Sequence, residues 1–310
     1  AGFEGAEIGL GARKRRGFGE CEVTNWQVQH YNLKDPKDLV DWIEGKGDNS
    51  KSGKPILELL DVELPEDKRK RFTLEAHFQL KTSLLIGSGS GAEDDPETVH
   101  LQSQRLDADE PTPILSGTSL AGAMRARATR IANTLYADKS NARELVNQVF
   151  GPDEVKEISE REPGEEPFAS RVVIHEREVQ GNFDLVQTRI RIDRFTGGTY
   201  PGALFEQQPV FGGENSDVCV SVELRHPEDE HIGLLLQVLK DLWTGDLPLG
   251  GEASVGRGRL QGIKAEMSLQ VPNKEKETWT ISAAEGGSLN IEGNRERLED
   301  FAEALAGGEK

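Results

Sequence analysis

Two glycine-rich loops carry basic side chains of the kind that bind a phosphate backbone. They are GLGARKRRGFGE at 9–20 and LGGEASVGRGR at 249–259, and corresponding glycines in the two loops are 239 residues apart. Glycine permits close backbone approach, and arginine donates paired hydrogen bonds to phosphate oxygens. One such loop is typical of an ordinary connection, but two similar loops favour an internal repeat with a groove for RNA. The candidate contact residues in the loops are Arg15, Arg16, Gly17, Gly250, Gly251, Ser254, Gly256, Arg257 and Arg259.

Two further segments place arginines beside a backbone that suits an anion. SGTS, at 116–119, precedes an amphipathic helix; it predicts at least an N-cap, and a glycine-led helix start also exposes N–H groups to an anion. In RIRIDRF, at 189–195, arginines alternate with isoleucines, as in a solvated edge strand or in a strand arm that packs on a nucleotide backbone. The candidate residues here are Gly117, Thr118, Ser119, Arg125, Arg130, Arg189, Arg191, Arg194 and Phe195.

An acidic cluster, EDDPE at 93–97, lies in a glycine-rich loop directly after a strand. Surface solvation is the ordinary role of such a cluster. The alternative is a carboxylate poised over RNA or a Mg²⁺ site, with Asp94 and Asp95 as metal ligands and catalytic residues. His100 and His175 are isolated histidines, for which a structural role is more common than acid–base catalysis, and His100 is the third catalytic candidate.

Composition limits the classes of function. The formal net charge of −18 argues against indiscriminate nucleic-acid binding, because an acidic surface repels phosphate, but it permits a local basic groove. Cys21 and Cys219 are the only cysteines and lie far apart, which indicates a reducing compartment. Neither a secretory signal nor a run of roughly eighteen apolar residues is present, so a cytoplasmic protein without a membrane partner is expected.

Apolar periodicity predicts a mixed α+β unit. FTLEAHFQL alternates as a half-buried strand does, and Leu120, Met124, Ala128, Ile131 and Leu135 share one face at helical spacing. The order βαββαβ predicts a ferredoxin-like (RRM-like) core with a long hairpin insertion, and the lack of an RNP aromatic motif argues against base stacking on its sheet. The expected elements are strands at 72–80, 171–175, 218–226 and 259–269, helices at 118–136 and 231–243, and an extended excursion at 184–211.

Taken in order, these segments resemble the RAMP superfamily of CRISPR-associated proteins. Within this superfamily, the sequence is more closely similar to the repeated backbone subunit of type III effector complexes. The segments that carry the resemblance are LLIGSGSG, ILSGTSLAGAMRARATR, RIRIDRFTGGTYPGALF and LGGEASVGRGR. On this basis we expect residues 72–270 to form one complete RAMP unit. Residues 1–45 are then the C-terminal end of a preceding unit, 46–71 a linker, and 271–310 a C-terminal strand and helix extension.

The resemblance implies a ribonucleoprotein of antiviral defence. The glycine loop and the arginine-bearing helix would bind the sugar-phosphate backbone of crRNA. The 184–211 excursion would form a thumb that displaces one nucleotide at regular intervals. Target RNA would be read by base pairing with the guide, not by protein. The implied partners are crRNA, target RNA, other backbone subunits of the effector and neighbouring RAMP units.

In active relatives, an aspartate in the loop after the first strand promotes cleavage of the target RNA. The matching position in this sequence falls near VHL at 99–101, which contains no aspartate, and LSG at 115–117 lacks the usual proline before glycine. Asp95, stiffened by the following proline, is preferred over Asp94 as a substitute, with Mg²⁺ as the expected cofactor.

Four functions therefore stay open at this point. The first is a backbone unit that binds crRNA and acts as a metal-dependent endoribonuclease on target RNA. The second is the same unit in a purely structural role. The third is a crRNA-processing endoribonuclease that uses His100 or His175 in acid–base catalysis. The fourth is a protein-interaction scaffold, which the net acidity favours.

Overall fold

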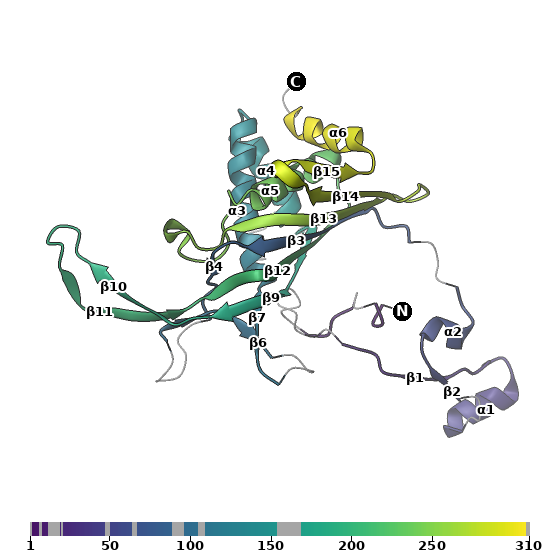
Figure 1. Cartoon of the computed structure of the whole chain (residues 1–310). Coiled ribbons are helices and arrows are strands. Elements are labelled where there is room, and N and C mark those ends of the chain that lie inside the picture. Colours follow the sequence, from purple (N-terminus) through teal and green to yellow (C-terminus); the bar gives the residue numbers. More distant parts are fainter. Residues whose placement is uncertain are drawn as a thin grey trace, which may run out of the picture. The chain divides into compact units, whose positions relative to one another are not determined.

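Figure 1 shows the computed structural model, which describes residues 2–5, 8–11, 19, 21–46, 50–63, 67–88, 96–104, 109–153 and 169–307. The chain divides into two compact units, Ala1–Asp67 and Lys68–Lys310. Among the described residues, no helix is both long enough and apolar enough to cross a membrane.

The first unit contains a pair of short strands and two short helices. Its elements are β1 (Trp26–Gln29), α1 (Pro36–Glu44), β2 (Ser50–Gly53) and α2 (Ile56–Leu60). β1 and β2 pair antiparallel. The side chain of Asp35 caps α1 by accepting a hydrogen bond from the Lys37 N–H, and Gly45 ends the helix in the left-handed conformation. Both β2 and α2 lie in the segment expected to be a linker, so that segment holds regular structure and pairs with β1.

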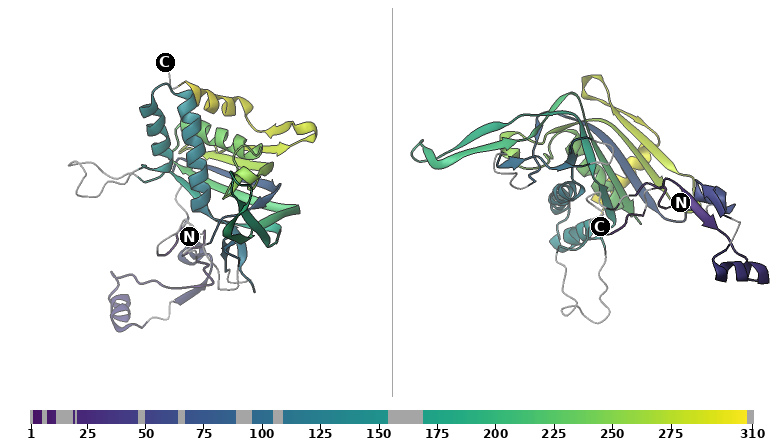
Figure 2. Two further views of the ribbon diagram at one scale, coloured as in Figure 1. Left: turned by 90° about the vertical axis from the view of Figure 1, so that its left-hand side faces the viewer. Right: turned by 90° about the horizontal axis from the view of Figure 1, so that it is seen from below.

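In its described residues, the second unit combines a large sheet with four α-helices. Its strands are β3 (Arg71–Leu80), β4 (Ser83–Leu84), β5 (Thr98–Val99), β6 (Gln102–Ser103), β7 (Thr112–Leu115), β8 (Val172–His175), β9 (Arg177–Asp184), β10 (Gln187–Ile192), β11 (Thr199–Gln208), β12 (Val210–Arg225), β13 (Leu260–Gln270), β14 (Glu277–Ala283) and β15 (Leu289–Glu292). Its helices are α3 (Gly117–Leu135), α4 (Lys139–Phe150), α5 (Asp229–Trp243) and α6 (Arg295–Ala306). The views in Figure 2 show the helices on one side of the sheet. The mixed α+β class is confirmed.

The main sheet runs in the order β15-β14-β13-β3-β12-β9-β7-β6, and β4 and β8 also pair with β12. β3 lies between β12 and β13 and is antiparallel to both. Because side chains alternate along a strand, β3 has one face in the core and one polar face. Its core residues are at most 2% exposed: Phe72, Leu74, Ala76, Phe78 and Leu80. α3 and α5 supply apolar side chains to the same core, among them Leu120, Met124, Leu234 and Val238.

A two-stranded arm extends from this sheet (Figure 1). β10 and β11 pair antiparallel along it, and the parallel strand β5 joins β11 at the base. The carboxylate of Asp193 shapes the tip by accepting hydrogen bonds from the N–H groups of Phe195 (2.7 Å) and Thr196 (2.9 Å). Gly197 follows with a φ of 69°, a conformation that favours glycine. The arm therefore ends in a defined turn that carries Phe195, which is 96% exposed.

Candidate nucleic-acid interface

The 249–259 glycine loop meets the base of the arm through one buried arginine. Arg257 Nη2 donates hydrogen bonds to the side-chain oxygens of Gln187 (2.9 Å) and Gln207 (3.1 Å), which are cross-strand partners in the arm. Its Nε lies 3.0 Å from a carboxylate oxygen of Glu252. Arg257 is only 2% exposed, and burial, with a second arginine nearby, lowers its pKa below the ordinary value. The geometry therefore favours a positioning role for Arg257 over the expected phosphate contact.

The loop itself is held against the chain that follows β3. The N–H groups of Gly251 and Gly258 donate hydrogen bonds to the carbonyls of Leu85 (2.8 Å) and Ser83 (2.6 Å). Gly258 has a φ of 75°, and a Cβ built on it would lie 1.9 Å from the carbonyl oxygen of Leu249. Only glycine fits there, so the loop has one fixed shape rather than a flexible one.

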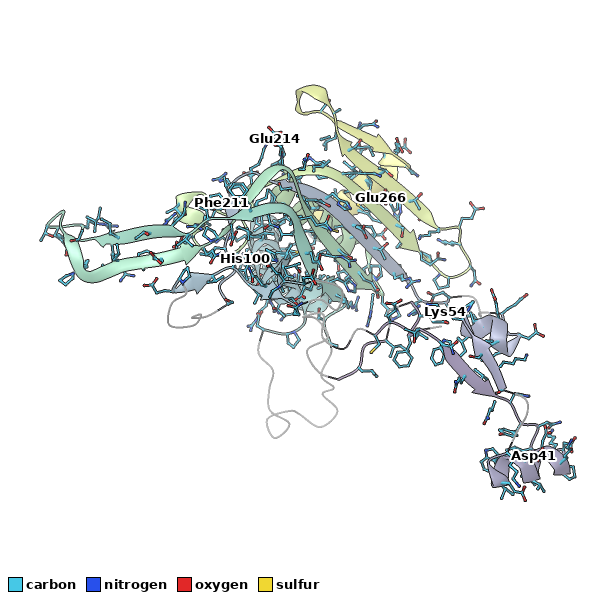
Figure 3. All side chains as sticks on the ribbon, turned by 60° about the horizontal axis from the view of Figure 1, so that its bottom comes forward. Asp41, Lys54, His100, Phe211, Glu214 and Glu266 are labelled. Atoms are coloured by element: carbon cyan, nitrogen blue, oxygen red, sulfur yellow. The ribbon has the colours of Figure 1, made fainter. Side chains whose placement is uncertain are left out.

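His100, labelled in Figure 3, links the same segment to β7, the strand that precedes α3. Its Nδ1 accepts a hydrogen bond from the Ile86 N–H (3.2 Å) and lies 3.1 Å from the Leu84 carbonyl, while Nε2 lies 3.0 Å from the Ile114 carbonyl. The side chain is 1% exposed, and burial lowers its pKa. A neutral ring with Nε2–H donating to the Ile114 carbonyl and Nδ1 accepting from the Ile86 N–H satisfies two of these three contacts. Since an acid–base catalyst needs an accessible nitrogen, the geometry favours a structural role over the catalytic one.

The N-terminus of α3 follows directly after β7 in the chain. Gly117 is buried, Thr118 is exposed and Ser119 is partly exposed, so the helix start presents polar groups to solvent. Ser116 Oγ and Thr118 Oγ1 lie 2.8 Å apart and hydrogen-bond to each other, and Ser116 makes no side-chain cap. The expected N-cap through a serine side chain is therefore not formed.

The two arginines singled out on α3 differ in surroundings. Arg125 donates a hydrogen bond to Asn147 Oδ1 (2.8 Å) and forms an ion pair with Asp153. These bonds hold it against α4, which disfavours the expected phosphate contact. Arg130 is exposed.

The arm and the loop carry the exposed basic side chains of this region. Arg191 and Arg194 are exposed near the tip of the arm, and Arg259 is exposed at the end of the loop. Arg189 is partly buried and lies 3.6 Å from Glu252. The remaining loop candidates Gly250, Gly251 and Ser254 are exposed, and Gly256 is partly exposed. The arrangement presents three exposed arginines and two exposed aromatic rings, Phe195 and Tyr200, on elements that Arg257 connects.

Several sequence candidates lie outside the described residues: Arg15, Arg16, Gly17, Asp94 and Asp95. The described residues end at Ser88 before this segment and resume at Pro96 after it. The Ser88 N–H donates a hydrogen bond to the Val99 carbonyl (3.1 Å), and the Glu97 carboxylate accepts one from the Glu206 N–H, which lowers the pKa of Glu97. The chain thus enters and leaves the acidic segment at the base of the arm.

Three residues of this site had no signal in the sequence. Gln187 and Gln207 become neighbours only because the hairpin pairs them. Glu252 lies within the 249–259 glycine loop, but no pattern in that loop identified it as the partner of an arginine. Glu252 adopts a φ of 59°, which is unusual for a residue with a side chain. Its carboxylate accepts a hydrogen bond from Gln207 Nε2 at 2.7 Å. A polar cluster at a strained backbone position is typical of functional sites.

The described part of the first glycine loop has the same closure as the second. The Leu10 N–H donates a hydrogen bond to the Gly19 carbonyl (2.7 Å), as the Leu249 N–H does to the Gly258 carbonyl (3.0 Å). A Cβ on Gly19 would lie 1.7 Å from the Leu10 oxygen, and the φ of Gly19 is 81°. Leu249 lies 239 residues after Leu10, and Gly258 lies 239 residues after Gly19. This is the same offset that separates the two loops in the sequence.

Comparison with known proteins gives one match. The family model of the RAMP superfamily matches residues 77–261. The matched region runs from the middle of β3 to the start of β13, so it includes α3, the arm and the second glycine loop. A search of curated proteins found no match.

Proposed function

The chain belongs to the RAMP superfamily, and from this premise we propose that it is a crRNA-binding backbone subunit of a type III CRISPR effector complex. The observation that carries the proposal is the junction at Arg257, which fixes the arm to the glycine loop. A positioned arm with exposed Arg191 and Arg194, beside a loop with exposed Arg259, suits a sugar-phosphate backbone. Bound target RNA, neighbouring RAMP units and other effector subunits complete the proposed assembly.

The strand order supports a ferredoxin-like core within this unit. In chain order the core elements are β3, α3, β8, β12, α5 and β13, and β3 lies between β13 and β12 with β8 on the far edge of β12. This is the arrangement of a split βαβ fold. The arm, inserted between β9 and β12, is the proposed thumb.

A tandem arrangement is supported by the repeated loop closure at Leu10–Gly19 and Leu249–Gly258. We propose that β1 and the loop before it correspond to β13 and the loop before it. Residues 1–45 then belong to the C-terminal end of a second RAMP unit. The division of the chain into two compact units, with Ala1–Asp67 as the first, is compatible with that proposal.

Retained RNA tests the binding proposal. The chain is co-expressed with a crRNA, purified in high salt and irradiated with ultraviolet light. We expect nucleic-acid absorbance in the purified protein and cross-linked peptides from the arm (187–208) and the loop (249–259). A protein-interaction scaffold would retain no RNA, and cross-links restricted to the polar face of the sheet would reject the arm and the loop as the interface.

Cleavage of target RNA is a second proposed activity, favoured by the position of Ser88 and Glu97 at the base of the arm. Asp94 and Asp95, which lie outside the described ranges, are the proposed catalytic pair, and Mg²⁺ is the proposed cofactor. In the assembled complex, Asp94→Ala with Asp95→Ala should remove one cleavage product and preserve RNA binding. Asp109→Ala is the matched control, because this exposed acid lies in the chain between β6 and β7. If the variant with both Asp94 and Asp95 replaced gives an unchanged set of cleavage products, these residues do not cut, and the unit has a structural role.

A further inference from the structure

The polar face of the main sheet carries a cluster of metal-ligating side chains. Glu75 and His77 are two residues apart on β3 and therefore point to the same face. Cys219, on β12, is the cross-strand partner of His77. One ligand atom from each of these three residues lies within 4.8 Å of the other two, and His77 Nε2 is 3.6 Å from Glu75 Oε1. Three donor types, a carboxylate, an imidazole and a thiol, thus converge on one point.

A fourth residue orients the imidazole. The carboxylate of Asp217 lies 2.9 Å and 3.1 Å from His77 Nδ1 through its two oxygens. A proton on Nδ1 directed at this carboxylate leaves the lone pair of Nε2 facing Glu75. Metal-binding histidines are commonly held in this way, with a carboxylate on the nitrogen that does not bind the metal.

Two cations lie beside the cluster, and each also interacts with a residue outside it. Lys264, the partner of His77 on β13, forms an ion pair with Glu266 at 2.5 Å (Glu266 is labelled in Figure 3). Arg177 Nη2 donates a hydrogen bond to Ser221 Oγ at 3.2 Å, and its guanidinium also interacts with the Cys219 thiol, as a single positive charge beside the two carboxylates of Glu75 and Asp217. The cluster therefore keeps an excess of negative charge from two carboxylates.

A divalent cation bound by these residues would displace the thiol proton of Cys219 and offset the charge of the carboxylates, as metals do with thiol ligands.

We propose that Glu75, His77 and Cys219 bind a divalent transition metal, with Zn²⁺ as the ion best suited to a mixed sulfur, nitrogen and oxygen set. Three protein ligands leave a fourth tetrahedral position open to water. The ligands come from β3 and β12, whereas the RNA interface is built from the arm and the glycine loop. The metal site therefore stands independently of the proposed RNA binding.

Cobalt is a suitable probe because Co²⁺ substitutes for Zn²⁺ and reports thiolate ligation by a near-ultraviolet charge-transfer band. The full chain is treated with a chelator, dialysed and titrated with Co²⁺. We expect a saturating band of one equivalent that Cys219→Ser abolishes. Cys21→Ser, the matched control, removes the other cysteine of the chain and should leave the band unchanged.

The other ligands are tested by affinity. His77→Ala and Glu75→Gln should each weaken Co²⁺ binding at least tenfold, and Asp217→Asn should weaken it by roughly 10- to 100-fold through loss of the oriented imidazole. Added Zn²⁺ should raise the thermal midpoint of the wild-type protein in proportion to the logarithm of its concentration. A wild-type titration without a thiolate band overturns the proposal whatever the variants do. A band that survives Cys219→Ser, or that disappears in Cys21→Ser, also overturns it.

Discussion

Replacing Arg257 by alanine removes the guanidinium that joins the glycine loop to the arm. Two hydrogen bonds, to Gln187 and Gln207, and the contact with Glu252 are lost at a position that is 2% exposed. Each hydrogen bond from a charged donor contributes about 1.5–3 kcal/mol. Glu252 keeps its hydrogen bond from Gln207, which limits the loss. We therefore expect the free energy of unfolding to fall by about 2–4 kcal/mol.

RNA binding should weaken in Arg257→Ala for a different reason from a lost phosphate contact. Because the guanidinium is buried, we expect it to make no phosphate contact, and its removal should lower affinity by misplacing the arm. The slope of log K against log salt concentration should therefore stay unchanged. In contrast, Arg259→Ala removes an exposed cation two residues away. It should reduce that slope by about 0.7 for a single strand and change stability by less than about 0.5 kcal/mol.

The assays are urea unfolding and fluorescence anisotropy with a labelled single-stranded RNA at several salt concentrations. The two variants form a matched pair on one loop, so a general effect of disturbing the loop appears in both. The positioning role is refuted if Arg257→Ala unfolds like the wild-type protein and its salt slope falls by the amount expected for Arg259→Ala.

Three further predictions test other parts of the molecule. Gly258→Ala should destabilise the protein by at least about 2 kcal/mol more than Gly256→Ala in urea unfolding, because both glycines have positive φ but only Gly258 faces a backbone atom at 1.9 Å. Phe195→Ala should weaken RNA binding by about 5- to 150-fold in anisotropy, as loss of one stacked base does, without changing the melting temperature; equal affinity would exclude the tip from the interface. His231 is fully buried, burial lowers its pKa to about 4, and an unfolded histidine titrates near 6.5. The unfolded chain then binds the extra proton between these pH values, so this residue should cost about 3 kcal/mol of stability as the pH falls from 7 to 4. His231→Gln should make the dependence of unfolding free energy on pH shallower by that amount, and an identical dependence in both proteins would contradict the assignment.

The elements in which apolar residues recur with a strong period could be predicted from the sequence. The alternation in FTLEAHFQL identified β3 because its apolar residues all face one core, and the helical spacing from Leu120 identified α3. The same spacing also placed Leu135 on the buried face, but this residue is 41% exposed at the end of the helix. α4 was not expected, although Asp138 caps it and its apolar residues recur at helical intervals. It follows α3 closely, and its polar surface masked that pattern.

The candidate site could be predicted from the sequence only in part, for a physical reason. Sequence patterns report residue type and spacing, so they identified the glycine loops and the arginines. They do not report burial, which is why Arg257 and Arg125 could not be distinguished from the exposed Arg191 and Arg259. Partners that meet only through hairpin pairing, such as Gln187 and Gln207, depend on a register that the sequence alone does not specify.

The salt dependence of RNA binding in two triple variants tests the central claim most directly. One variant replaces Arg191, Arg194 and Arg259 by alanine. The control replaces Arg225, Lys274 and Arg295, which are exposed cations. Arg225 pairs with Arg71 at the start of β3, whereas the glycine loop packs beyond its other end. Each variant loses three charges, so a change in net charge alone affects both equally. For single-stranded RNA we expect the slope of log K against log salt to fall by about 2 in the first variant and to stay at the wild-type value in the control. Equal slopes in the two variants would contradict an RNA interface on the arm and the glycine loop.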